Sequence, residues 1–531
     1  MKTRHFLIIA ALLMPFIFRD YTPDNELRYI SIADEAIQDG TWFTFHNHGE
    51  AYADKPPLYF WLVMLSRLLL GSHQMWLLGL FSILPMIGTL LLMDKWLRRE
   101  RQGFDTVTCD WLMATTGFFL ASALVLRMDM LMTFFITLSL YTFWRLYKGI
   151  AAPREKWLLP VYIFLALFTK GPYGVMIPLA SMALFTGCFG GGLKQFGRYF
   201  GVRQLGILLA LCALWFAAIY WEGGSEYLDN LLFKQTIGRG VHSFHHAQPI
   251  WYYLVRLPLT LAPWSLLYLA VIGRGLFKIK EKSDLEKFFL TVIATTFVML
   301  SLVSSKLDIY LIPIYPFVVG LSVLWLEPLR RKWYTRAAVA VPAALFILVL
   351  PAALIAKGQM PQFAGLSMSW AYLGAALLLA GGTAGLLLIK DAGRSATASA
   401  MGLTGMILAA SLNLPAVNDR IGLERLTRAG AALAAEHRAE GYAFYKFRGE
   451  NLDVYLGTQL SGFYTLEELK KLDASSPVLL FIRGREVRRE KELERWLDGK
   501  PEVRVGDYRA VIAGHPQLKP KKNNQDTKTD E

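Results

Sequence analysis

The chain has little charge and almost no cysteine, and each shortage narrows its class. Asp, Glu, Lys and Arg make up only 18% of its 531 residues, whereas a soluble protein of this length forms several domains with far more surface charge. The three cysteines, Cys109, Cys188 and Cys212, show no CxxC spacing. Neither a disulfide framework nor a cysteine metal site is therefore indicated.

Apolar runs fill most of the remaining sequence. Hydrophobic residues make up 54% of the chain, and most lie in runs close to the roughly 20 residues that a helix needs to cross a bilayer. Lipid forces backbone polar groups into helices or closed barrels, so the sequence predicts a polytopic α-helical membrane protein with about 13 spans. The predicted spans are 1–18, 74–93, 111–126, 130–144, 157–169, 172–190, 204–221, 257–273, 288–303, 309–326, 337–356, 370–389 and 401–414.

The first apolar run also fits the pattern of a cleaved signal peptide. Lys2 and Arg4 precede it, as basic residues do in such peptides. No small-x-small cleavage site follows, only Arg19-Asp20-Tyr21. We therefore expect the run to be retained as the first membrane helix.

Basic residues gather in alternate connections between the spans, for example at 95–101 and 330–336. The positive-inside rule places these connections in the cytoplasm. The opposite face then receives two long loops, 19–73 and 222–256, and short connections at 127–129, 170–172 and 304–308. The net charge of +14 follows from this topology. The sequence has no aromatic-basic interleaving typical of a nucleic-acid surface, so no nucleic-acid partner is predicted.

The sequence pattern changes after the predicted membrane domain, 1–414. Residues 415–515 mix amphipathic helical segments with apolar strand-like ones such as YAFYKF and PVLLFI, which predicts a small soluble α/β domain. This region contains no phosphate loop, no GxGxxG motif and no clustered metal ligands. An odd number of spans places it outside the cytoplasm. The polar tail, 516–531, is predicted to be disordered.

Ionisable residues from five connections converge on the predicted outer face. A carboxylate at such a surface suits a general base, and nearby Lys and Arg suit a phosphate. The pattern therefore favours group transfer from a phosphorylated lipid. Simple snorkelling accounts equally well for Arg127 or Lys306 taken singly, but Asp24 and Asp129 are too short to snorkel far. The Trp and Tyr residues of these loops are also typical of an interfacial belt.

Five motifs then carry a resemblance to a known family. They are PDNELRY at 23–29, DKPPLYFW at 54–61, RMD at 127–129, QPIWYY at 248–253 and SKLDIYLIP at 305–313. In order and in shared side of the membrane they resemble the outer-face motifs of GT-C glycosyltransferases. The resemblance is strongest to the protein O-mannosyltransferase superfamily and, within it, to the lipid A aminoarabinose transferases. It covers roughly residues 1–414.

The resemblance implies an inverting glycosyltransferase of the bacterial inner membrane that uses a polyprenyl-phosphate sugar, with its active site and C-terminal domain facing the periplasm. The acidic residue of the first motif would be catalytic. Alignment on Arg28-Tyr29 puts Asn25 where the family has Asp, so we expect Asp24 to be the base, with Glu26 as the alternative. The residues expected to bind the substrates are Arg28, Tyr29, Lys55, Tyr59, Arg127, Asp129, Lys170, Lys306 and Tyr310.

A divalent metal site is a further implication of the resemblance. Some relatives bind a metal through an acidic residue before the KPP motif and a loop histidine. Here these would be Asp54 with His245 or His246. A solvated loop with incidental histidines is the alternative, because the spacing is not that of a helical zinc motif.

Two other classes of function stay open at this point. A transporter or flippase also carries charges within a helical bundle, but usually at the bilayer midplane and with repeat symmetry. A non-catalytic scaffold would tolerate replacement of Asp24 and Glu26. The acceptor also stays open, between lipid A, an envelope glycan and a protein Ser or Thr side chain.

Overall fold

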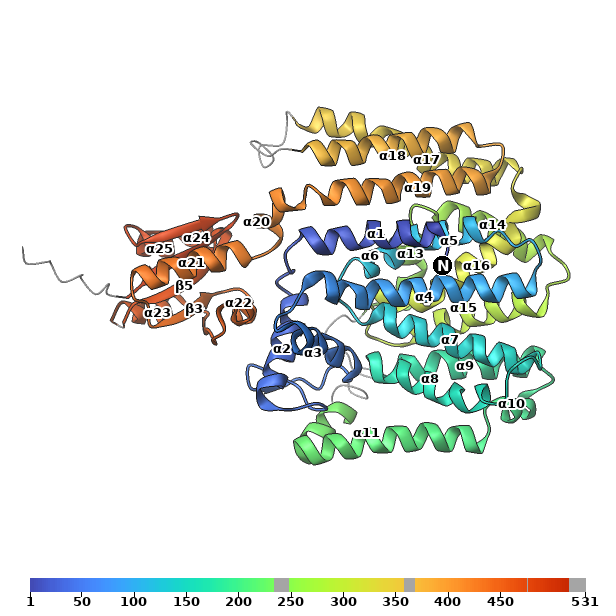
Figure 1. Cartoon of the computed structure of the whole chain (residues 1–531), viewed down its shortest axis with the longest axis horizontal. Helices are drawn as coiled ribbons and strands as arrows, with labels where there is room; N and C mark the ends of the chain where they lie inside the picture. Colours follow the sequence, from blue (N-terminus) through green and yellow to red (C-terminus); the bar gives the residue numbers. More distant parts are fainter. Residues whose placement is uncertain (234–247, 358–367, 475, 515–531) are drawn as a thin grey trace, which may run out of the picture. The chain divides into compact units, whose positions relative to one another are not determined.

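The computed structural model describes residues 1–233, 248–357, 368–474 and 476–514 (Figure 1). It divides into two compact units, which are described one at a time. The first comprises Met1–Arg19 and Ile32–Ala416, and the second comprises Asp20–Ser31 and Val417–Glu531. The predicted metal ligands His245 and His246 and the predicted tail at 516–531 lie outside the described residues.

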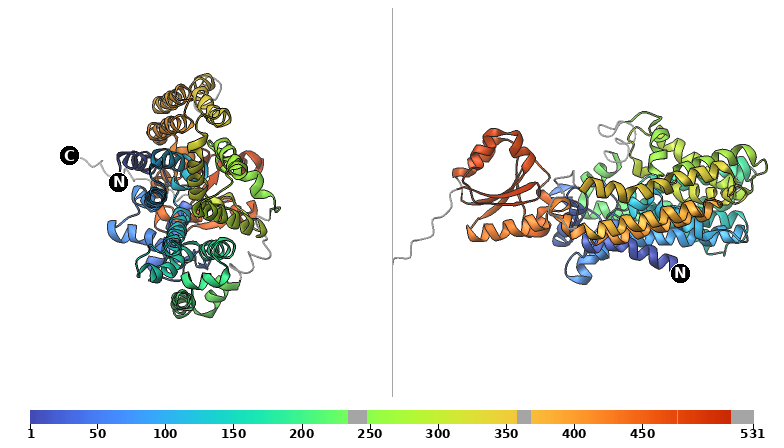
Figure 2. Two further views of the ribbon diagram at one scale, coloured as in Figure 1. Left: turned by 90° about the vertical axis from the view of Figure 1, so that its right-hand side faces the viewer. Right: turned by 90° about the horizontal axis from the view of Figure 1, so that it is seen from above.

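The first unit is a bundle of helices, and the left view of Figure 2 shows its long helices nearly end-on and side by side. Its helices are α1 (Thr3–Phe18), α3 (Leu58–Leu70), α4 (Met75–Glu100), α5 (Thr106–Thr115), α6 (Gly117–Ala123), α7 (Asp129–Tyr147), α8 (Glu155–Lys170), α9 (Tyr173–Phe189), α10 (Leu193–Tyr199), α11 (Val202–Asp229), α13 (Tyr252–Thr260), α14 (Ser265–Lys278), α15 (Asp284–Leu302), η2 (Asp308–Ile314), α16 (Tyr315–Leu326), η3 (Glu327–Leu329), α17 (Trp333–Lys357), α18 (Ser369–Leu387) and α19 (Ala392–Ser411). Helix α16 is apolar on all sides and buried along its whole length, which is typical of a helix at the centre of a bundle.

Six helical stretches are long and apolar enough to cross a membrane, and up to eight if each of two bent helix pairs is counted as one span. These figures cover the described ranges and rest on length and composition. The six are Met75–Glu100, Val202–Phe233, Asp284–Leu302, Asp308–Leu329, Trp333–Ile355 and Ser369–Leu387. The chain is therefore a multi-pass membrane protein, and the count of thirteen spans stays a prediction.

Tertiary contacts break one of the predicted spans. The stretch 111–126 is divided between α5 and α6, with Thr116 in an extended conformation between them. The Gly117 N–H donates to the carbonyl oxygen of Ala262 at 2.7 Å, and a Cβ on Gly117 would lie 2.6 Å from that oxygen. Glycine thus allows the backbone of a distant segment to approach the break.

The second unit contains the small C-terminal sheet that the sequence predicts. Its strand order is β4-β3-β5-β7-β6, with β3 parallel to β4 and β5, and β7 antiparallel to β5 and β6. The strands are β3 (Gly441–Tyr445), β4 (Ser461–Phe463), β5 (Val478–Arg483), β6 (Glu502–Val505) and β7 (Tyr508–Ala513). The other elements are η5 (Leu414–Val417), which begins in the first unit, α20 (Asn418–Ile421), α21 (Glu424–Glu436), η6 (Glu450–Leu452), α22 (Asp453–Leu456), α23 (Leu466–Lys470), η7 (Lys471–Ala474), α24 (Gly484–Arg489) and α25 (Lys491–Leu497).

Helices cover both faces of this sheet, because alternate strand residues face opposite sides. Leu480 and Ile482 of β5 pack in a core with α23, α24 and α25. Leu479 and Phe481 pack in a second core with α21. The domain therefore has three layers with an apolar core on each side of the sheet.

The helix α2 (Glu26–Asp39) begins in the second unit and ends in the first. It is followed by a short hairpin of β1 (His46–Asn47) and β2 (Glu50–Ala51). Asp20–Ser31, which carries the first motif, falls within the predicted range 1–414 but belongs to the same compact unit as the C-terminal sheet. The acidic motif and the C-terminal domain therefore form one body.

Candidate functional site

A cavity of about 350 Å³ lies in the first unit, where the junction of α8 and α9, the loop before α3 and the segment before η2 meet. Its polar lining consists of Asp54, Lys55, Lys170, Tyr173, Ser305 and Tyr310, and its apolar wall includes Leu167, Met176, Trp215, Phe216 and Leu231. Apolar walls with a few convergent polar groups are typical of a ligand site. Four of the predicted site residues, Asp54, Lys55, Lys170 and Tyr310, are thus brought together.

Lys170 at the end of α8 supplies a buried cation to this cavity. Its side chain is 4% exposed, and its ammonium donates to the fully buried carboxylate of Asp129 at the start of α7. The Arg127 Nε donates to the second oxygen of that carboxylate at 3.1 Å. One carboxylate therefore faces two cations, and the surplus positive charge beside the cavity favours an anionic ligand. Arg127 and Asp129 act on the cavity through Lys170 rather than by lining it.

Two tyrosines continue the polar wall next to this lysine. The Lys170 Nζ lies 5.0 Å from the centroid of the Tyr310 ring, within the range of a cation–π interaction. The Tyr310 and Tyr173 ring centroids are 5.1 Å apart. Gly171 lies between α8 and α9 with φ +97°, a conformation that favours glycine. This turn allows Lys170 and Tyr173, on successive helices, to line the same cavity.

The loop before α3 is held so that Lys55 reaches the cavity. The Glu222 carboxylate on α11 accepts backbone N–H groups from residues 42–44, the shortest at 2.7 Å. The Tyr227 hydroxyl, also on α11, donates to the carbonyl oxygen of Tyr52 at 2.9 Å. Two side chains of α11, one on each side of its kink at Gly224, therefore fix the loop on both sides of its hairpin. These contacts give a loop residue, Lys55, the fixed position that a binding group needs.

Two predicted binding residues of the first unit, Lys306 and Tyr59, lie outside the lining of the cavity. Lys306 is 3% exposed, and its ammonium donates to the carbonyl oxygens of Gln248 at 2.9 Å and Val303 at 2.5 Å. Burial lowers the pKa of this ammonium. Tyr59 is 1% exposed within α3. Neither side chain is among the described residues that line the cavity.

An ion pair that the sequence analysis did not assign joins α13 to the start of η2. The Arg256 Nε lies 3.0 Å from both oxygens of the Asp308 carboxylate, and the Tyr252 hydroxyl donates to the same carboxylate at 2.9 Å. A charge inside an apolar run was the available signal, because such charges are costly unless paired or functional. Tyr173, which lines the cavity, carried no comparable signal in the sequence.

The first motif is described within the second unit. Asp24 is exposed, whereas Glu26 is 1% exposed. The Glu26 Oε2 accepts the N–H of Thr22 at 2.8 Å, as in a helix-capping arrangement. The Arg28 Nη2 donates to the Asn25 Oδ1 at 2.9 Å. Of the two acidic candidates, Asp24 therefore has the accessible carboxylate. Tyr29 is buried.

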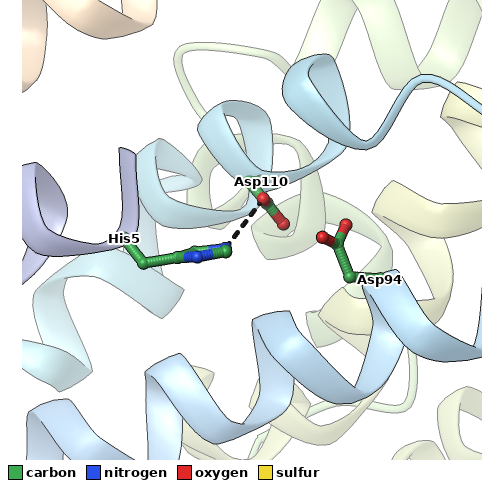
Figure 3. A group of neighbouring side chains, drawn as sticks. All are labelled: His5, Asp94 and Asp110. Carbon is green, nitrogen blue, oxygen red and sulfur yellow. Dashed lines mark hydrogen bonds and ion pairs between the residues drawn. The ribbon is translucent and has the colours of Figure 1, made fainter. Parts of the chain in front are cut away.

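Within the described ranges, one group of three residues offers metal-type ligands close together: His5, Asp94 and Asp110 (Figure 3). The His5 Nε2 lies 3.0 Å from the Asp110 Oδ2. The Arg4 guanidinium donates to both carboxylates, at 3.0 Å to Asp94, and Arg98 donates to Asp94 at 2.6 Å. Guanidinium groups thus already neutralise both carboxylates, and the cluster joins α1 to α4 and α5 as a buried ion-pair network.

Comparison with known proteins finds similar sequences and a similar fold. A sequence model of the family described as dolichyl-phosphate-mannose-protein mannosyltransferase matches residues 17–221. The undecaprenyl phosphate-alpha-4-amino-4-deoxy-L-arabinose arabinosyl transferase of Pseudomonas savastanoi pv. phaseolicola is 27% identical over 364 residues, which are 67% of this chain and 67% of that protein. A protein of Aquifex aeolicus is 26% identical over 60% of this chain and 62% of its own length. The matches thus span about two thirds or less of these relatives.

A solved structure shares the fold over nearly the whole chain. ArnT from Cupriavidus metallidurans, in the crystal structure bound to undecaprenyl phosphate, superposes with a TM-score of 0.74 and covers 96% of this chain and 98% of its own. The chain therefore has the GT-C membrane fold of ArnT, and its sequence is similar to those of the aminoarabinose transferases and the protein mannosyltransferases. Sequence identity to that structure is 17%, so it establishes the GT-C membrane fold. The predicted family resemblance is confirmed.

Proposed function

We propose that this protein is an inverting glycosyltransferase that moves a sugar from a polyprenyl-phosphate donor to an envelope acceptor. The observation that carries the proposal is the cavity, which places Lys55 and Lys170 beside an apolar wall. Two cations suit a phosphate, and the apolar wall suits the lipid chain next to it. Similarity to undecaprenyl-phosphate aminoarabinose transferases supports the same class of donor.

In the proposed reaction the donor phosphate is the leaving group. The bond between the anomeric carbon and the phosphate oxygen breaks, and its electron pair leaves with the polyprenyl phosphate. The acceptor oxygen or nitrogen forms a bond to that carbon from the opposite face, and its proton passes to a carboxylate. Lys55 and Lys170 stabilise the charge that develops on the phosphate. Asp129 and Arg127 hold the Lys170 ammonium in place.

We assign Asp24 as the general base. Its side chain is exposed, so it can meet an acceptor, and a positioned base typically contributes a factor of about 10² to 10⁴. The buried Glu26, which accepts the Thr22 N–H, has a structural task. Arg28 and Tyr29 would complete the donor site from the same segment.

The proposal includes a topology with thirteen spans, with the active site and the C-terminal domain in the periplasm. Alternate basic connections support that orientation by the positive-inside rule. The acceptor would then be lipid A, an envelope glycan or a protein side chain.

A divalent ion held by Asp54 with His245 or His246 is part of the proposal. The Asp54 carboxylate lines the cavity and is half-buried, and carboxylate and imidazole groups are common ligands of divalent ions. Such an ion would add positive charge beside the donor phosphate. The chain's own residues would bind and orient the substrates as described above.

Mass spectrometry of polyprenyl-phosphate lipids, in cells with and without this protein, tests the function. We expect one lipid-linked monosaccharide to accumulate when the protein is absent, because its consumer is missing. The same accumulation should follow Lys55→Ala. An unchanged lipid pool together with a mislocalised envelope component would contradict a transferase and favour a transporter or flippase.

A further inference from the structure

The segment that carries the acidic motif is attached at its start to the C-terminal domain. The Asp20 carboxylate accepts the Tyr455 hydroxyl at 2.6 Å and the Glu424 N–H at 2.8 Å. The Asp20 N–H donates to the Asn418 Oδ1 at 3.2 Å. Asp20 itself is 8% exposed, so these hydrogen bonds lie in a largely water-free contact and are stronger for it.

A glycine makes this close approach possible. A Cβ on Gly422 would lie 1.9 Å from the Asp20 Oδ2, which no side chain could accept without displacing the carboxylate. The ring of Tyr21 also lies beside that of Tyr455, with centroids 6.4 Å apart. The contact thus involves backbone and ring atoms of both partners, with the Asp20 carboxylate between them.

The same segment is attached again at its other end. The Ser31 hydroxyl donates to the Asp453 Oδ2 at 2.8 Å, and Asp453 begins the helix α22 that also carries Tyr455. One short helix of the C-terminal domain therefore holds both ends of the segment 20–31.

Local hydrogen bonds stiffen the chain between these two attachments. The Leu27 N–H donates to the carbonyl oxygen of Thr22 at 3.2 Å, and the Tyr29 N–H donates to that of Asn25 at 3.1 Å. Burial raises the pKa of the Tyr508 phenol on β7, and among the charges near it the Asp24 carboxylate adds to that rise. Asp24 therefore lies close enough to β7 for its charge to act on the Tyr508 phenol.

We propose that the C-terminal domain is a positioning element of the active site, with Tyr455 and Asp453 on α22 holding the segment that carries Asp24. This inference rests on the proposed transferase function, and it assigns the domain a role in setting the geometry of the base. Tyr455, Asp453 and Asp20 are positioning residues, since they act through Asp24. The donor-binding lysines Lys55 and Lys170 belong to the first unit.

A kinetic consequence follows from this division between the units. Loosening the attachment should lower kcat, because the base is then held in productive geometry for less of the time. The KM for the polyprenyl-phosphate donor should change less than kcat, because Lys55 and Lys170 belong to the first unit and only Arg28 among the donor's cationic contacts moves with the segment. A general loss of folded protein would instead lower the active fraction without changing the kinetics of each folded molecule.

The test compares two tyrosines of the same domain in the full-length protein. Tyr455→Phe removes the hydroxyl that donates to Asp20, whereas Tyr445→Phe removes one that donates to the Glu490 carboxylate at 2.9 Å. We expect Tyr455→Phe to lower kcat about tenfold with a smaller change in donor KM, and Tyr445→Phe to leave both constants as in the parent. Of these two variants, only Tyr455→Phe should show faster hydrogen exchange of the backbone at 20–31. Ser31→Ala, at the other attachment, should show the same pattern.

Equal kcat values for Tyr455→Phe and Tyr445→Phe would overturn the proposal. So would faster exchange at 20–31 in Tyr455→Phe with kcat unchanged, because the attachment would then be purely structural. A parent protein that transfers no sugar from any polyprenyl-phosphate donor would instead contradict the proposed function, and the inference would fall with it. The activity of the parent therefore distinguishes the two failures.

Discussion

Two buried clusters of opposite charges lie in the helical bundle, and they differ in what surrounds them. In the first, Lys170 pairs with Asp129 and faces a cavity with aromatic and apolar walls. In the second, Arg4 bridges Asp94 and Asp110. Half of the described residues around the space beside that second cluster are exposed cations, and there is no Tyr, Trp or Phe among them.

The comparison teaches that buried charge alone does not identify a functional site. Both clusters carry the cost of removing charges from water, and both meet it by pairing. Only the Lys170 cluster combines its cation with a wall that could accept a lipid or a sugar. The second cluster is better explained by the attachment of α1 to α4 and α5 at the basic end of the bundle.

The largest expected effect is loss of sugar transfer when Lys170, the buried cation of the cavity, is replaced. Lys170→Ala should lower kcat about 10² to 10³-fold, the usual loss when one charge-stabilising group is removed from a transition state. Lys170→Arg should retain part of the activity, because it keeps the charge. Radiolabelled transfer assays on purified protein would measure both, and equal activity of Lys170→Ala and the parent would remove the cavity from the mechanism.

The second cluster should respond to mutation in stability rather than in catalysis. Arg4→Ala leaves the Asp110 and Asp94 carboxylates partly uncompensated, which typically costs about 3 to 5 kcal/mol in the free energy of unfolding. Thermal unfolding in detergent would show the loss. The kcat of the remaining folded protein should match the parent, and a selective fall in kcat would mean that this cluster also contributes to the reaction.

Removal of a divalent ion should affect the cavity beside Lys170 and not the cluster around Arg4. If the ion lies at Asp54, a chelator should lower transfer about tenfold, on the scale of lost metal-site support, and added divalent ions should restore it. His5→Gln should respond to the chelator as the parent does, whereas Asp54→Asn should be slow and insensitive to it. Loss of the chelator response in His5→Gln would instead assign the metal site to the second cluster.

The smallest expected effect concerns the ring beside Lys170. Tyr310→Phe keeps the face of the ring on which the ammonium lies, so donor KM should change less than twofold. Tyr310→Ala removes the cation–π contact, which is worth about 0.5 to 2 kcal/mol, and should raise donor KM severalfold. Steady-state kinetics with varied donor would separate them, and equal KM values for the two variants would exclude the ring as the relevant group.

Much of the fold could be predicted from the sequence because hydrophobic periodicity and span length are local properties. The multi-pass membrane class and the C-terminal sheet both follow from such patterns. The break between α5 and α6 could not be predicted, since it depends on the Gly117 N–H meeting the carbonyl oxygen of Ala262. Contacts between residues so distant in sequence leave no local pattern.

The candidate site divides in the same way. The sequence alone determined which residue types were available, so Lys55, Lys170 and Tyr310 could be named from motifs and from charges at the ends of apolar runs. Only the tertiary structure decided that these three line one cavity, that Asp129 acts behind Lys170, and that Tyr173 joins them. It also decided that Asp20–Ser31 belongs with residues almost 400 positions later, through the bond from Asp20 to Asn418. The physical reason is that hydrophobicity is a property of each residue, whereas the partner of a buried charge depends on how the helices pack.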